Sequence, residues 1–339
     1  MKKLPEDYYL RQRRKCWQRE KRSHRSSRGT ERNSYNAALA SLMGREVCPA
    51  PKDVSFYADA VDSTVGFAIA IRRMVCDDKK VLVDFSGTDY LSATAAVYLF
   101  SEIAILQANY GDQSVRIDEG GASPFVRRLM RQIGLFELAN GTPEPGGDLM
   151  PIVCGRRNDY LEEMVDFVIK RAVANRQLDE AEQATAEFLT GRAISEAMLN
   201  VHHHAYAEGQ DSPWWVTAAI IKDELFIALC DRGFGIPKTL PKTVWWEKAM
   251  GLLPINTDGQ MIQAAMTYTR SSLGKKGGRG LGTKDMQKLV LEQKRGHFTV
   301  VSGRGHYRLS GDTGKEEVNS VELDITGTVI QWRIPLNHN

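Results

Sequence analysis

Two polar side chains near the middle of the chain have the types and the spacing needed to act on a phosphate group. Glu196 and Asn200 are four residues apart within residues 193–206, so a helix would place them on one face. An amide oxygen can bind Mg²⁺, and a carboxylate can orient or deprotonate a nucleophile beside a phosphate. Because asparagine has a poor helix propensity, we predict that Asn200 is a magnesium ligand, with Glu196 as the catalytic base.

Two later stretches supply groups that could hold a nucleotide. Asp231 ends an apolar strand and precedes Gly233 and Gly235, which let the backbone approach a flat ligand closely. Residues 277–283 form a glycine-rich loop that opens a helix, and the backbone N–H groups of such loops bind phosphates. The candidate phosphate-binding residues are Lys275, Gly278, Arg279, Gly280, Leu281, Gly282 and Thr283. Together the three stretches predict a nucleotide pocket.

The elements that must position these residues are helices followed by strands. The Glu196 helix carries an apolar stripe on its other face, made of Ala193, Ile194, Ala197, Met198 and Val201. Helices ahead of largely antiparallel strands predict an α/β two-layer sandwich. The predicted helices are 158–176, 179–207 and 258–269, the last within a lid at 238–276, and the predicted strands are 214–222, 225–230, 297–302, 306–309, 321–325 and 328–334.

The first half of the chain also alternates strands and helices. The helix at 123–134 has Pro124 near its first turn and Gly134 at its end, a typical pair of boundary signals. The other predicted elements are strands at 79–85 and 115–117 and a helix at 93–108.

Residues 34–50 and 140–150 have the composition of linkers. We therefore divide the chain into a basic arm with its linker (1–50), an α/β domain (51–140) and a nucleotide-binding domain (151–336).

Composition excludes several classes of protein. With 339 residues, of which 42% are hydrophobic and 26% charged, the chain reads as a soluble globular protein of about two domains. It contains no apolar run of the roughly 18 residues that span a bilayer, and its charged start is unlike a secretory signal. The five cysteines are scattered and include no Cys-x-x-Cys pair, which argues against a disulfide framework or a zinc site and favours the cytoplasm.

The net charge of +3 hides an asymmetry along the chain. Residues 1–33 hold 12 Lys/Arg and four Asp/Glu, whereas the remainder is acidic. Tyr8, Tyr9 and Trp17 lie among these basic residues, as in arms that bind nucleic acid through phosphate contacts and stacking. A solvated basic tail with no specific partner is the alternative, and the sequence leaves both open.

The three stretches match the N, G1 and G2 boxes of the gyrase–Hsp90–histidine kinase–MutL (GHKL) ATP-binding superfamily. Residues 155–336 most closely resemble the anti-sigma-factor serine/threonine kinases of partner-switching systems, whose box helix has the pattern met here by Glu196, Ala197, Asn200, His204 and Tyr206. Residues 327–335 are similar to the closing strand of the superfamily. The resemblance implies ATP and Mg²⁺ as cofactors, an adenine-binding Asp231, a base pocket shaped by Gly233 and Gly235, and support from Thr328.

Residues 51–140 resemble a STAS domain, the fold of anti-sigma-factor antagonists. The matching segments are residues 83–87, with the sequence Val-Asp-Phe-Ser-Gly, and residues 123–135. The resemblance implies that Thr94 stands at the phospho-acceptor position, although the Asp and Gly expected around it are missing. The alternative is that Ser92 is an ordinary helix N-cap and Thr94 a first-turn residue.

The combined expectation is an Mg-ATP-binding regulatory protein, either an anti-sigma-like protein kinase or ATPase in partner switching, or a non-catalytic ATP-dependent switch. The expected partners are ATP and a signalling protein of the STAS or anti-sigma type. Nucleic acid bound by the arm and a second copy of the chain are further candidates, and no membrane partner is expected. His202, His203 and His204 point about 100° apart on a helix, so they are not expected to chelate one metal ion together.

Overall fold

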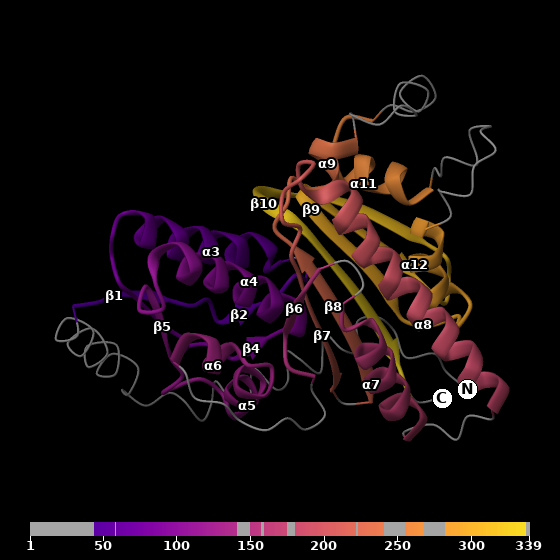
Figure 1. The fold of residues 1–339 in the computed structure, drawn as a ribbon, viewed down its shortest axis with the longest axis horizontal. Coiled ribbons are helices and arrows are strands. Elements are labelled where there is room, and N and C mark those ends of the chain that lie inside the picture. Colours follow the sequence, from indigo (N-terminus) through magenta and orange to yellow (C-terminus); the bar gives the residue numbers. More distant parts are fainter. Residues whose placement is uncertain are drawn as a thin grey trace.

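The computed structural model in Figure 1 describes residues 44–57, 59–140, 150–156, 159–174, 180–221, 223–240, 255–267 and 282–336. These residues form a mixed α/β structure with both parallel and antiparallel sheets. Within them, no helix has both the length and the apolar character needed to cross a membrane.

The strands and helices of the first half, in chain order, are β1 (Glu46–Pro49), β2 (Asp53–Val54), α3 (Val61–Cys76), β3 (Val81–Asp84), β4 (Tyr90–Leu91), α4 (Ala93–Tyr110), β5 (Val115–Asp118), α5 (Pro124–Gln132) and α6 (Leu135–Asn140). Those of the second half are β6 (Val153–Gly155), α7 (Leu161–Ala174), α8 (Glu180–Asn200), the π-helix η1 (Val201–Ala205), β7 (Trp214–Ile221), β8 (Glu224–Asp231), α9 (Ile236–Thr239), α11 (Asp258–Thr267), α12 (Gly282–Leu291), β9 (His297–Ser310) and β10 (Glu316–Pro335).

The described part of residues 44–140, which we call the N-terminal module, is built on a parallel sheet of order β1-β3-β5. All four residues of β3 are buried, as its continuous apolar run predicts. Ser92 and Ser123 cap α4 and α5 by accepting hydrogen bonds from Ala95 N and Val126 N. The predicted strands and helices of this half are therefore confirmed.

The assignment of residues 1–50 to an arm and linker is wrong at its end, because Glu46–Pro49 form strand β1. Each of these residues pairs with one of Val81–Asp84 in β3. Cys48 is buried in the core, and Arg45 donates to Val81 O and Gln113 O. Proline and cysteine suggested a linker, but an edge strand tolerates a proline whose N–H is not needed for pairing.

The second half is organised around a five-stranded antiparallel sheet of order β6-β7-β8-β10-β9, here called the central sheet. The predicted hairpin of β7 and β8 is confirmed, and Asp223 in its turn has a φ of 61°. Four shorter strands predicted near the end of the chain merge into the two long strands β9 and β10. Register shifts between Ser320 and Thr328 carry this pair through the interruptions that the sequence pattern suggested.

The two faces of the central sheet are covered by different parts of the chain. On one side, the helix face, α7, α8, α11 and α12 pack on a cluster that includes Trp214, Leu229 and Trp332. On the other side, the module face, α3 and α4 pack on Phe226, Cys230 and Val329. Figure 1 shows the module and the helix layer on opposite sides of the sheet. The two-layer expectation is therefore incomplete, because the module adds a third layer.

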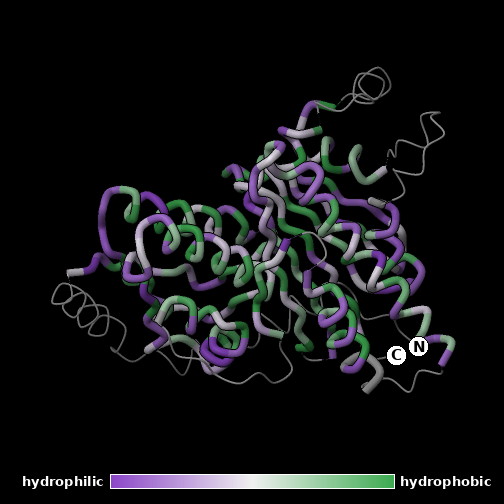
Figure 2. Tube along the Cα trace, viewed as in Figure 1, coloured by the Kyte–Doolittle hydropathy of each residue, from purple (hydrophilic) through white to green (hydrophobic). Residues whose placement is uncertain are grey.

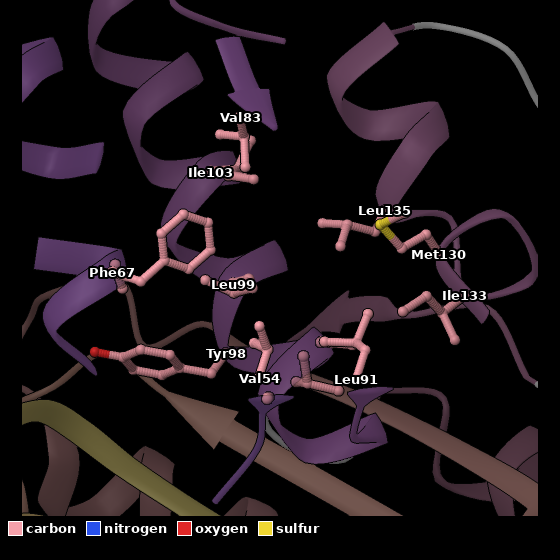
Figure 3. Packing of buried hydrophobic residues seen from close by; sticks show 14 of the residues in the cluster. Val54, Phe67, Val83, Leu91, Tyr98, Leu99, Ile103, Met130, Ile133 and Leu135 are labelled. Carbon is pink, nitrogen blue, oxygen red and sulfur yellow. The ribbon is translucent and has the colours of Figure 1, made fainter. Parts of the chain in front are cut away.

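A continuous hydrophobic core joins the module to the central sheet. Residues from β3 and α4 belong to the same buried cluster as Trp215, Ala228 and Val301 of the central sheet. Figure 2 shows hydrophobic segments continuing from the module helices into the strands of this sheet. In Figure 3, Tyr98 of α4 lies near those strands, below other core side chains of the module. Apolar packing of this extent favours a fixed arrangement of the two parts.

Candidate functional site

The helix that carries the first two candidate residues forms as predicted. The apolar stripe of α8 is buried against the central sheet, while Glu196 and Asn200 are half-buried. The side chain of Asn200 hydrogen-bonds that of Glu196. Burial and the negative charge of Asp285 raise the pKa of Glu196, and Arg192 and Asn200 only partly offset this effect. A carboxylate with a raised pKa is better suited to accept a proton near neutral pH.

An ion pair with a buried carboxylate connects the N-terminus of α12 to α8. Asp285, in the first turn of α12, is buried and pairs with Arg192 of α8 and with Lys288. Burial opposes the ionisation of Asp285, but the hydrogen bonds from Arg192 and Lys288 outweigh it and lower the pKa. Gly282 and Thr283 begin α12, so this contact holds a helix N-terminus beside α8. Such an end favours anions.

Asp231 ends β8 on the helix face of the sheet. It is directly opposite Thr328 of β10, which in turn pairs with Ser302 of β9. Hydrogen bonds from Gly233 N, at 2.8 Å, and from Thr328 support the carboxylate. Burial nevertheless dominates and raises the pKa of Asp231 to about 6. A buried carboxylate at a strand end is a strong acceptor for a ligand N–H group.

The glycines after Asp231 are required by the packing of the loop itself. A Cβ atom on Gly233 would lie 2.0 Å from Ala205 O, and one on Gly235 would lie 2.8 Å from Ser302 Oγ. Gly235 also has a φ of 83°, which L-residues rarely adopt. The sequence predicted that these glycines let the backbone approach a ligand closely. The structure shows that they are also needed because the loop packs closely against Ala205 and Ser302.

Residues 231–235, here called the Asp231 loop, are fastened to the segment that follows α8. Phe234 N donates to Ala205 O at 2.7 Å, and Arg232 N donates to Tyr206 Oη at 3.0 Å. Tyr206 donates to Pro213 O, which holds the phenol in place. These bonds bring the loop with Asp231 to the end of the helix that carries Glu196 and Asn200.

The structure brings together most of the candidate residues that it describes, and it leaves others untested. Those around the end of α8, the Asp231 loop and the start of α12 are Glu196, Asn200, Asp231, Gly233, Gly235, Gly282, Thr283 and Thr328. Lys275, Gly278, Arg279, Gly280, Leu281 and most of the lid at 238–276 lie outside the described residues. His202 Nδ1 lies 3.5 Å from Ser212 Oγ within the turn after α8. In the described ranges, no group of three His, Cys, Asp or Glu side chains could hold a metal ion.

Thr94 lies on the far side of the central sheet from Glu196. It is 2% exposed and hydrogen-bonds Gln331 of β10 on the module face. Ser92 is the N-cap of α4, and Thr94 is in its first turn. Ser92 and Thr94 therefore have the N-cap and first-turn positions of the alternative, and the sheet separates Thr94 from Glu196.

Several residues of this region escaped the sequence analysis. Ser302 accepts from Ile236 N and donates to Gly327 O, both at 2.9 Å, so it anchors the end of the Asp231 loop. Nothing in the local pattern marks it, because its role follows from strand register. Arg192 and Asp285 carried a usable signal, since Arg192 is four residues before Glu196 and Asp285 follows the glycine-rich loop.

Comparison with models of known protein families and with curated proteins finds no match for this chain. The buried Asp231 could accept from an N–H group of a ligand, and Asn200 could be one of the one or two protein ligands that Mg²⁺ needs beside phosphates and waters.

Proposed function

We propose that this chain is an Mg-ATP-binding regulatory protein of the GHKL type, with a STAS-like module at its N-terminal side. The observation that carries the proposal is the meeting of the Asp231 loop with the end of α8. This contact puts a buried carboxylate near the Asn200–Glu196 pair. Asp231 and Thr328 would hold the base, Asn200 would bind Mg²⁺, and the N-terminus of α12 would face phosphate.

Glu196 would act on the nucleophile in a protein kinase or an ATPase. Its raised pKa and its hydrogen bond with Asn200 support the role of a base beside the metal ligand. For a kinase, a hydroxyl on a separate protein is a better candidate than Thr94, which is buried on the other face of the sheet. A protein of the anti-sigma or STAS type is the partner class that the sequence resemblance favours.

A non-catalytic switch is the second candidate, and a specific contact favours it. Arg232 of the Asp231 loop pairs with Glu102 of the module. Nucleotide binding at the loop could then be transmitted to the module without hydrolysis or transfer. In this case the output would be a change in partner binding by the whole chain.

Glu196→Ala separates these candidates. The purified chain is given Mg²⁺ and γ-labelled ATP, while free phosphate, label on protein and ATP affinity are followed. A kinase or ATPase should lose turnover by about 10²-fold or more and keep its ATP Kd within about threefold. Glu187→Ala is the matched control, because Glu187 is exposed on the same helix, two and a half turns earlier and therefore on the opposite side from Glu196. Equal turnover in the two variants would favour the switch, and absent ATP binding by the unmodified chain would refute the proposal.

A further inference from the structure

A buried cluster of charges joins the module to the Asp231 loop. Glu102 of α4 is 2% exposed and accepts from Arg72 of α3 at 2.7 Å and 2.6 Å. It also pairs with Arg232, whose side chain is 4% exposed. The guanidinium of Arg232 lies over the Tyr98 ring, 4.4 Å from its centroid. One module carboxylate therefore binds one arginine of its own and one from the loop.

The position of Arg232 in the chain makes this contact relevant to the site. Successive residues of an extended strand point to opposite faces of the sheet. Asp231 faces the helix layer, whereas Arg232 faces the module, as its contacts with Glu102 and Tyr98 require. A shift of the Arg232 backbone would therefore also move the carboxylate of Asp231.

The Asp231 loop is held from both sides by this arrangement. On the helix side, three N–H groups, from Arg232, Phe234 and Ile236, donate to acceptors outside the loop, which are Tyr206 Oη, Ala205 O and Ser302 Oγ. A fourth bond, from Gly233 N to Asp231 Oδ1, closes the loop on itself. On the module side the Arg232 side chain is anchored to Glu102. A buried charge without its partner is strongly disfavoured, so loss of Glu102 would force Arg232 to seek water.

We propose that Glu102 and Arg232 are positioning residues for the candidate nucleotide site, and that docking of the module sets the shape of the Asp231 loop. This inference rests on the proposed function for its ligand. The module is then a built-in part of the site, acting through the loop from the opposite face of the sheet. A change in the module that weakens the Glu102 contact would lower ATP affinity without touching a residue that meets ATP.

The test compares Glu102→Gln with Glu119→Gln in the full chain. Both variants remove one module carboxylate that binds an arginine, but Glu119 pairs with Arg131 inside the module. Isothermal titration with Mg-ATP should give a Kd at least tenfold weaker for Glu102→Gln and within twofold of the unmodified chain for Glu119→Gln. The double variant Glu102→Gln/Arg232→Gln removes both charges. Its fold-increase in Kd should be smaller than the product of the fold-increases in the two single variants.

Amide hydrogen exchange without nucleotide gives a second readout that does not need ATP. In Glu102→Gln the amides of residues 232–236 should exchange at least tenfold faster, while those of β7 keep their protection. If the unmodified chain does not bind ATP, the proposed function fails, and this exchange still tests the coupling of the module to the loop. Equal effects of Glu102→Gln and Glu119→Gln on loop exchange, or no effect of either, would overturn the inference.

Discussion

The ionisation of Asp231 connects the candidate site to pH. Its pKa of about 6 means that roughly half of the carboxylates are protonated at that pH, and about 90% at pH 5. If the ionised form accepts the ligand N–H, the Kd for Mg-ATP should weaken about tenfold from pH 7 to pH 5. Isothermal titration across this range would measure the change, and Asp231→Asn should bind weakly with little pH dependence. A flat profile for the unmodified chain would contradict this role.

Ionisation of the same residue lowers the stability of the folded state. The pKa of Asp231 is higher in the folded state than the value of about 3.9 for an unfolded chain. The folded state therefore binds the proton more tightly, and this group lowers the free energy of unfolding as pH rises from about 4 to about 6. The shift corresponds to about 3 kcal/mol at neutral pH. Chemical unfolding at several pH values measures the free energy of unfolding. Its decrease between about pH 4 and pH 6 should be smaller in Asp231→Asn than in the unmodified chain, and the difference isolates Asp231 from the other titrating groups.

The Asp231 loop is the element whose shape matters most to the site. Gly233→Ala would place a methyl group 2.0 Å from Ala205 O, so the loop must move away from the end of α8. We expect a loss of about 2 to 3 kcal/mol of stability and a weaker ATP Kd, measured by urea unfolding and titration. Gly87→Ala is the control, because its Cβ would have no atom within 4 Å. Similar losses in the two variants would show that the contact with Ala205 is not decisive.

Helix α8 combines two tasks at the element scale. Its apolar stripe binds it to the central sheet, and its polar face carries Glu196, Asn200 and Arg192. The helix then continues into the π-helix η1, whose last residue, Ala205, receives the Asp231 loop. Short π-helical segments often occur at functional sites, and here the segment lies where two stretches of the site meet.

The whole molecule should unfold as one unit, since a single core extends from the module into the central sheet. Residues 44–140 contain no Trp, whereas Trp214, Trp215 and Trp332 are in the central sheet. In a chain whose other three tryptophans, Trp17, Trp245 and Trp246, are changed to Phe, tryptophan fluorescence reports on the sheet, and far-UV circular dichroism reports on the whole chain. Thr94→Val removes the partner of buried Gln331 and should lower stability by about 1 to 3 kcal/mol while the two transitions remain coincident.

The control for this substitution is Thr185→Val on α8. The Thr185 side chain is exposed, and its hydroxyl donates to Ala181 O of the same helix. Its effect on stability should stay within about 0.5 kcal/mol. If Thr94→Val instead separates the fluorescence and dichroism transitions, the module and the sheet are independent units. The coupling proposed through Glu102 would then also lose its structural basis.

The sequence by itself determined several helices and strands and the polar residues at characteristic positions on them. The spacing of Glu196 and Asn200, the strand that ends at Asp231 and the serine caps at Ser92 and Ser123 are local patterns, and local backbone physics is enough to interpret them. It also placed two strands and two helices of the first half, at β3, β5, α4 and α5, but it gave no prediction for the 16-residue helix α3. It misjudged Glu46–Pro49, because a proline at a strand edge has the same local signal as a linker.

Only the tertiary structure decided which residues meet across the sheet. The pairing of Thr328 with Asp231 and Ser302 depends on register between strands far apart in the chain. The burial of Thr94 and the contact of Glu102 with Arg232 depend on how the module docks on the central sheet. This docking is driven by hydrophobic packing, which is non-directional, so no local sequence pattern specifies which surfaces meet. Sequence spacing reports neighbours on one element, whereas contacts between layers arise from the packing of whole faces.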